Sequence, residues 1–164
     1  GGMSIGDSLL DYVTEERINL AEKVTYINED FYGIKLNVDS KNYDRIRVHL
    51  KQNDLKYKIY ALEADKIFQN INDCYTLKDN HVDALSKIFL NYKTSDFKKR
   101  KHSDPRAKDS YTTDFYFQFD NGSVANVSCY DWSKEYNEYG IEDVLRIGIF
   151  PREFNNWLNE KAFK

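Results

Sequence analysis

The stretch TDFYFQFDNGSVANVSCY, Thr113–Tyr130, decides the fold, because it reads as two strands joined by a tight turn. In its first half three phenylalanines alternate with polar residues, which is the period-two pattern of a strand with one buried face. Asp120, Asn121 and Gly122 follow as a turn signal, and the chain then returns as a second strand that ends near Tyr130. The sequence therefore predicts an antiparallel hairpin with an aromatic face.

Outward from this hairpin, hydrophobic periodicity predicts four further strands and three helices. Strands are expected where apolar and polar residues alternate, and helices where apolar residues recur every three or four positions after a capping residue. Asn72 or Asp73 is the expected cap of the second helix, and Pro151 fits the first turn of the last one, where its missing N–H costs nothing. The expected strands are residues 31–38, 46–50, 56–63 and 145–149, and the expected helices are residues 9–18, 73–92 and 151–162.

The predicted element order is α-βββ-α-βββ-α, which indicates an α+β fold, an antiparallel sheet or sheets with helices packed on one face. Residues 1–164 form a single domain in this reading. Its halves look alike, since Ile5-Gly6-Asp7-Ser8 and Ile71-Asn72-Asp73-Cys74 each open a helix that leads into three strands. A duplication of residues 4–64 and 71–150, followed by a C-terminal helix 151–162, is one explanation. The other is that helix caps and hairpin turns resemble one another in any α+β protein.

The composition is that of a folded chain with no obvious partner. Of its 164 residues 15% are aromatic, the net charge is −3, and no apolar run approaches the length of a membrane span. Seven Lys or Arg residues against two Asp residues fall between positions 93 and 108, in an otherwise acidic chain. Nucleic-acid binding is one reading, but the acidic body favours a solvated, mobile connection between the second helix and the fourth strand. The candidate basic patch is Lys98, Lys99, Arg100 and Lys101.

No catalytic, metal or cofactor site emerges from the motifs. Gly6-Asp7-Ser8-Leu9 resembles the block that names the GDSL lipases and esterases, but no apolar strand precedes it and no Asp-x-x-His follows. Because a serine without a base is not activated, Ser8 is read as a helix cap. The histidines, His49, His81 and His102, lack the short spacing of metal ligands.

Two surfaces are candidates for binding. Residues 45–49 place Arg45, Arg47 and His49 on the solvent face of a strand. The segment from Asp131 to Asp143 mixes aromatic and acidic residues, and it is either an interface with aromatic anchors or a lid folded back on the core. Its candidate binding residues are Trp132, Glu135, Tyr136, Glu138 and Tyr139.

The chain has two cysteines, Cys74 at the start of a helix and Cys129 near the end of a strand. In a helix-on-sheet arrangement these positions can come within bonding range, so a disulfide is the favoured reading. Two buried thiols, or a reactive Cys74 at a helix N-terminus, are the alternatives.

The repeated α-βββ order resembles the architecture of the BamE/SmpA lipoprotein domain and of the beta-lactamase inhibitor protein. The resemblance covers most of the chain but rests on no motif, and those repeats usually begin with two helices where one is found here. It implies a periplasmic or secreted module that binds another protein. A small enzyme or a ligand carrier with a pocket between helix and sheet is the alternative function, and the cytoplasm is the alternative location.

Overall fold

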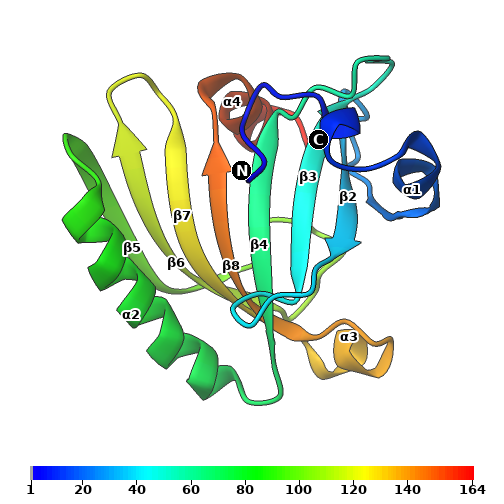
Figure 1. Ribbon diagram of the computed structural model, residues 1–164. Coiled ribbons are helices and arrows are strands. Elements are labelled where there is room, and N and C mark those ends of the chain that lie inside the picture. The colour runs from blue at the N-terminus through cyan, green and yellow to red at the C-terminus, as the bar shows by residue number, and fades with distance from the viewer. Residues whose placement is uncertain (1) are drawn as a thin grey trace.

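The computed structural model describes residues 2–164, which form one antiparallel sheet of eight strands with helices on both of its faces (Figure 1). The strands lie side by side in the order β1-β2-β3-β4-β8-β7-β6-β5. In chain order the elements are the 3₁₀ turn η1 (Leu9–Asp11), α1 (Glu15–Leu20), β1 (Glu22–Val24), β2 (Phe31–Asn37), β3 (Arg45–Lys51), β4 (Ala61–Phe68), α2 (Ile71–Ile88), β5 (Tyr92–Lys101), β6 (Tyr111–Phe119), β7 (Val124–Asp131), α3 (Lys134–Glu138), β8 (Asp143–Phe150) and α4 (Arg152–Glu160).

The predicted α+β class is confirmed, but the predicted order is two strands short. Each half of the chain is a four-stranded meander preceded by helix, and the halves join where β4 pairs with β8. The strands missing from the prediction are β1, which has three residues, and β5. The expected third strand, residues 56–63, in fact begins at Ala61 as β4, because the backbone loops at Asn53 and Tyr57, where φ is positive.

The basic segment is a strand and not the expected mobile connection. β5 lies at the edge of the sheet and pairs only with β6, so nearly all its side chains face solvent. An edge strand that is wet on both faces needs no alternation of apolar residues, which is why periodicity does not reveal it. Lysines along such an edge also discourage pairing with another chain.

The aromatic hairpin is confirmed as β6 and β7. Gly122 has a φ of +81°, the left-handed conformation that the turn requires, and the Asn121 side chain accepts a hydrogen bond from the Ser123 N–H. The buried face of the hairpin, with Phe117 and Val127 at its centre, packs against α2. The cap of this helix is Asn70 and not the expected Asn72 or Asp73, since the Asn70 side chain accepts from the backbone N–H of Asn72, and the helix ends at Ile88, before the expected residue 92.

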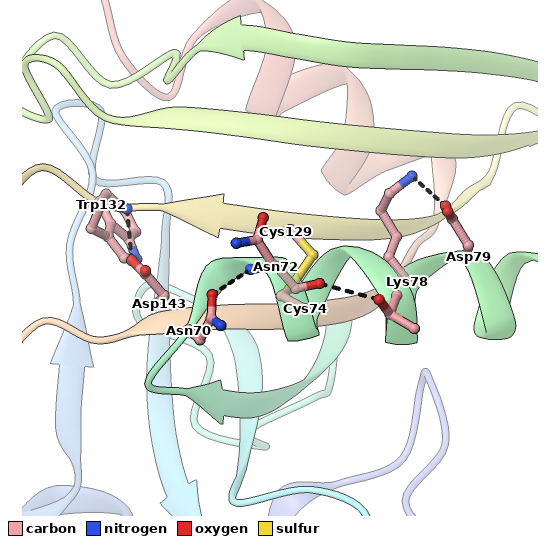
Figure 2. Close-up of a disulfide and its surroundings, with 9 residues drawn as sticks. Asn70, Asn72, Cys74, Lys78, Asp79, Cys129, Trp132 and Asp143 are labelled. Carbon is pink, nitrogen blue, oxygen red and sulfur yellow. Dashed lines mark hydrogen bonds and ion pairs between the residues drawn. A yellow bond between two sulfur atoms is a disulfide. The ribbon is translucent and has the colours of Figure 1, made fainter.

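The predicted proximity of the cysteines is confirmed. The Sγ atoms of Cys74, in the first turn of α2, and Cys129, on β7, lie 2.05 Å apart, at disulfide distance (Figure 2). Both residues are fully buried, and they pin α2 to the sheet of its own half. A loop of this size, closed over a sequence separation of 55, is worth about 4 kcal/mol in the chain-entropy model.

The first predicted helix is two short segments, η1 and α1, and not one. Ser8 caps η1 by accepting from the Leu10 N–H, as expected for this serine. Leu9 and Ile18 then pack on the apolar side chains of β2 and β3, among them Ile34 and Val48.

The last helix, α4, lies on the opposite face of the sheet. Pro151 precedes it as the N-cap residue. Phe154 and Trp157 pack on Phe31 and Phe150, and Phe150 shares its side of β8 with Arg146 because the two are four residues apart in one strand. The expectation of helices on one face is therefore wrong for α4. No helix within residues 2–164 is long and apolar enough to cross a membrane.

Candidate functional site

The face of the sheet opposite α2 is lined by polar side chains, and we call it the polar face. Strand register aligns them in two rows across the sheet, because residues paired between neighbouring strands point to the same side. The first row is Arg47, Glu63, Gly148, Asn126 and Tyr116, and the second is Arg45, Asp65, Arg146, Ser128 and Asp114.

A buried ion network occupies the middle of the polar face. Arg146 donates two hydrogen bonds to Asp65, from Nε at 2.7 Å and from Nη2 at 3.2 Å. Arg47 Nη2 reaches the same carboxylate at 3.4 Å. Glu63 Oε2 lies 2.9 Å from His49 Nε2, and Glu63 Oε1 lies 3.7 Å from Arg146 Nε. We refer to these five residues as the ion network.

The prediction that Arg45, Arg47 and His49 face solvent is wrong. His49 is 1% exposed, and the side chains of Arg45 and Arg47 are 18% and 13% exposed. Their acidic partners sit on the next strand, at Glu63 and Asp65. A basic and an acidic strand with matching alternation is the signal that could have revealed a buried pairing.

The ion network holds its carboxylates in the ionised form. Burial alone would raise the pKa of Glu63, but Arg146, His49 and Arg47 outweigh it and bring that pKa well below its usual range. The pKa of Asp65 is likewise lowered, with burial opposed by Arg146 and Arg47. The pKa of Arg146 is raised despite burial, because Asp65 and Glu63 favour its charged form. The network therefore keeps its charges at any pH above strongly acidic values.

A cavity of about 690 Å³ lies over the polar face. The ion network forms part of its floor through Arg47, Glu63 and Arg146, and the end of α4 with the residues after it forms one side. The residues on its other sides come mainly from β5 to β8 and from the segment that follows β5. The aromatic residues that line it are Tyr26, Phe97, Tyr116, Tyr130, Trp132, Phe150 and Phe163.

The segment between β5 and β6, residues 102–110, encloses this cavity. It starts at one edge of the sheet, yet Arg106 Nη2 donates to the Thr25 carbonyl at 3.2 Å, just beyond β1 at the opposite edge. In Figure 1 this yellow-green connection passes behind the central strands. The phenol of Tyr136 donates to the Arg106 carbonyl at 2.5 Å and ties the segment to α3. The polar face is thereby bridged from edge to edge.

The aromatic-acidic segment supplies a wall to the cavity. The Arg146 guanidinium lies 4.3 Å above the Tyr130 ring, Tyr130 stacks on Trp132 at 5.6 Å, and Trp132 stacks on Tyr136 at 5.7 Å. The Trp132 backbone N–H donates to Asp143, which fixes the start of the segment (Figure 2). Trp132 and Tyr136 are thus folded back, as in the lid interpretation.

The remaining candidates of this segment face outward. Tyr139 is 79% exposed, and Glu135 and Glu138 are exposed on α3, a short helix where no internal structure was expected. Sequence reasoning grouped these residues with Trp132 and Tyr136, and the structure separates them.

The four residues of the basic patch are also separated. Lys98 pairs with Asp96 and Lys99 with Asp131, both at the surface. The guanidinium of Arg100 turns to the polar face, where its Nε donates to Asp114 Oδ2 at 2.7 Å and its Nη2 bonds the Tyr116 hydroxyl. Lys101 borders the cavity, but its pairing with Tyr111 directs its side chain to the other side of the sheet.

The lining of the cavity carries more positive than negative charge. Seven of its lining residues are Lys or Arg and three are Asp or Glu, in a chain whose net charge is −3. The basic residues are Arg47, Arg100, Lys101, Arg106, Arg146, Lys161 and Lys164, and the acidic ones are Glu63, Asp104 and Asp114.

No protein-family model matches the chain, and a search of the curated proteins finds no match.

Two polar atoms on the cavity floor have no hydrogen-bond partner within the described residues, Arg47 Nε and Asn126 Oδ1. Asn126 is 4% exposed, and its Nδ2 donates to Ser128 Oγ at 3.0 Å. Gly148 beside it has no room for a side chain, since a Cβ there would lie 2.7 Å from Asn126 Oδ1 and 2.6 Å from the Phe150 ring. Buried polar atoms without partners are uncommon in folded proteins and mark this floor as a place with unused hydrogen-bonding capacity.

The three histidines lie in different parts of the fold. The Nδ1 atom of His49 is 3.3 Å from the Tyr26 hydroxyl, His81 stacks on Tyr43 from α2, and His102 contacts Trp132 at the cavity. Burial is the main cause that lowers the pKa of His102. Among residues 2–164 no group of three His, Cys, Asp or Glu side chains is arranged to hold a metal ion.

Proposed function

We propose that this protein binds a small molecule in the cavity over the polar face. The observation that carries the proposal is the cavity itself, about 690 Å³ and bounded by the sheet, the end of α4 and residues 102–106. Sites for small ligands usually measure about 300–1,000 Å³ and combine aromatic walls with a few fixed polar groups. The ion network, Asn126 and the Tyr130–Trp132 stack supply both kinds of surface.

The protonation states of the groups on the cavity floor favour binding over acid–base catalysis. A general acid or base works best when its pKa lies near the working pH. Glu63 and Asp65 have lowered pKa values, and burial raises the pKa of Tyr26 and of Tyr116. These groups form a fixed electrostatic surface, which suits a carrier or binding protein.

We place the protein in the bacterial envelope or outside the cell. The disulfide-distance pair Cys74 and Cys129 supports this, since disulfides persist in oxidising compartments and are rare in the cytosol.

The proposed site can be tested by filling it. Ser95 lines the cavity from β5, whereas the neighbouring Thr94 points to the other side of the same edge strand. Ser95→Trp should abolish binding of probes, and Thr94→Trp should leave it intact. The probes are 2-naphthol, 2-naphthamide and 2-naphthoate. Their binding is measured by nuclear magnetic resonance, from changes in the amide chemical shifts of β6, β7 and β8. If none of them perturbs these strands in the wild-type protein, the cavity is not a ligand site.

Protein binding through the outward side of residues 131–143 is a second candidate, in line with the resemblance to the BamE/SmpA and inhibitor-protein architectures. The exposure of Tyr139 together with Ile141, which is 37% exposed, favours it. Tyr139→Ser with Ile141→Ser should abolish capture of a partner from an envelope extract, while Lys134→Gln should not. Unchanged capture by the double variant would remove this candidate.

A further inference from the structure

The arginines that line the cavity are balanced by carboxylates of the protein itself. The two arginines of the ion network each pair with both of its carboxylates. Of the other arginines in the lining, Arg100 pairs with Asp114 and Arg106 pairs with Asp104, both at 2.7 Å. A charged group of a ligand would therefore give up its hydration without meeting a free opposite charge. The floor of the cavity favours an uncharged ligand.

The lysines of the lining do not place a charge inside the cavity. Lys101 is paired with Tyr111, which directs its side chain to the other side of the sheet. Lys161 and Lys164 follow α4 and are exposed. Water and salt screen exposed charges strongly, so these two lysines discriminate only weakly between ligands.

Asn126 keeps an unused acceptor on the cavity floor. It lies on β7, lines the cavity and is 4% exposed. Its Nδ2 donates to Ser128 Oγ at 3.0 Å, but its Oδ1 has no partner in the part of the chain that the structure describes. A buried acceptor without a donor is unfavourable, and a ligand that brings the donor recovers the lost hydrogen bond.

The ring of Phe150 helps to shield this oxygen. Strand register places Gly148 beside Asn126. A Cβ at Gly148 would lie 2.7 Å from Asn126 Oδ1 and 2.6 Å from two ring carbons of Phe150, so the oxygen and the ring edge lie close together over the glycine. A donor reaches Oδ1 once the ring edge moves aside, which changes a side chain and no strand pairing.

Building on the proposed function, we infer that the ligand is an uncharged molecule with a hydroxyl or amide group, and that Asn126 Oδ1 accepts a hydrogen bond from this group. The balanced charges of the floor select against an ion, and the unused acceptor selects for a donor. Asn126 is thus a residue that determines specificity, because an analogue without the donor leaves its oxygen unpaired.

Probes that differ in a single donor test the inference. 2-Naphthol and 2-naphthamide have a donor and no charge, 2-methoxynaphthalene has neither, and 2-naphthoate has a negative charge and no donor at neutral pH. 2-Naphthol should bind about tenfold more tightly than 2-methoxynaphthalene, which is the effect of one hydrogen bond. 2-Naphthamide should bind more tightly than 2-naphthoate. Isothermal titration calorimetry measures the four affinities, and the side-chain amide resonances of Asn126 should shift more with 2-naphthol than with 2-methoxynaphthalene.

Asn126→Leu, which removes the acceptor and nearly keeps the shape of the side chain, should bring the ratio of the 2-naphthol and 2-methoxynaphthalene affinities close to one. Asn155→Leu is the matched control. Asn155 lines the same cavity from α4, but its Oδ1 already accepts from Asn159 Nδ2 at 3.2 Å. The ratio in this control should stay at its wild-type value.

Equal wild-type affinities for 2-naphthol and 2-methoxynaphthalene would overturn the inference and leave the proposed function standing. An Asn126→Leu protein that keeps the wild-type ratio would also overturn it. If that variant does not fold, the wild-type affinities and the Asn126 resonances decide the question. Tighter binding of 2-naphthoate than of 2-naphthamide would overturn the choice of an uncharged ligand. Failure of every probe to bind would instead remove the proposed function.

Discussion

The two faces of the sheet are buried in opposite ways. The face under α2 is closed by apolar packing around Phe117, Val127 and Leu145, and a disulfide fixes the helix on it. The polar face is closed by α4 at one end and by ion pairs at its centre. Apolar packing stabilises a fold directly, whereas a buried ion pair must first offset the cost of removing its charges from water. The ion network therefore contributes less to stability than apolar packing of the same area would, and it fixes charges where a binding floor would need them.

The strongest test of this difference between the two faces is to remove one residue of the ion network. Asp65→Ala leaves Arg146 and Arg47 buried without their shared carboxylate, and it should lower the free energy of unfolding by about 4 kcal/mol. Urea denaturation followed by circular dichroism measures the loss. The double variant Asp65→Leu with Arg146→Met, which removes both charges, should lose far less. Equal losses in the single and double variants would show that charge burial is not what distinguishes this face.

Loss of the disulfide on the apolar face should destabilise the protein less than loss of Asp65 on the polar face. Cys74→Ala with Cys129→Ala should lower the free energy of unfolding by about 3 kcal/mol, which is less than the chain-entropy value because residual structure already constrains the unfolded chain. The same denaturation experiment applies, and intact mass with and without reduction and alkylation checks that the wild-type pair is bonded. 2-Naphthol binding should persist at temperatures where the variant stays folded. Lost binding in the folded variant would mean that the two faces are not independent.

The smallest effect is expected from acid, and it should arise on the polar face. Glu63 and Asp65 have pKa values in the folded protein below those of the unfolded chain, 4.5 and 3.8. Their contribution is therefore complete above about pH 5 and decreases as the pH falls, because the unfolded chain then binds protons that the folded one does not. We expect a loss of about 2 kcal/mol between pH 5 and pH 3.5. Glu63→Gln should flatten this dependence, and an unaltered slope in that variant would contradict the assignment.

Local patterns in the sequence predict what is local in the fold. The β6–β7 hairpin follows from alternation and a glycine turn, and the proximity of Cys74 and Cys129 follows from their places in a helix and a strand. β5 escapes prediction because its edge position imposes no apolar period. The amphipathic pattern of α4 shows that the helix packs on something, but not which face of the sheet receives it.

The sequence does not predict the candidate site, for a related reason. Arg47 and His49 in alternation with apolar residues normally indicate a solvated face. Their partners are 14 to 18 residues away on β4, and Arg146 comes from the other half of the chain, 81 residues from Asp65. Pairings this distant are set by the order of strands in the sheet, which no single stretch of sequence encodes.

The contact between Arg106 and the Thr25 carbonyl has a mechanical consequence. Strands β1 and β5 are the two margins of the sheet, and the segment that follows β5 crosses the polar face, so that the Arg106 guanidinium bonds the Thr25 carbonyl just beyond β1. The bend of the sheet and the space beneath it are then linked through a single hydrogen bond of 3.2 Å. Any flexing that moved the two margins of the sheet apart would therefore strain this contact, while every strand pairing could stay as it is.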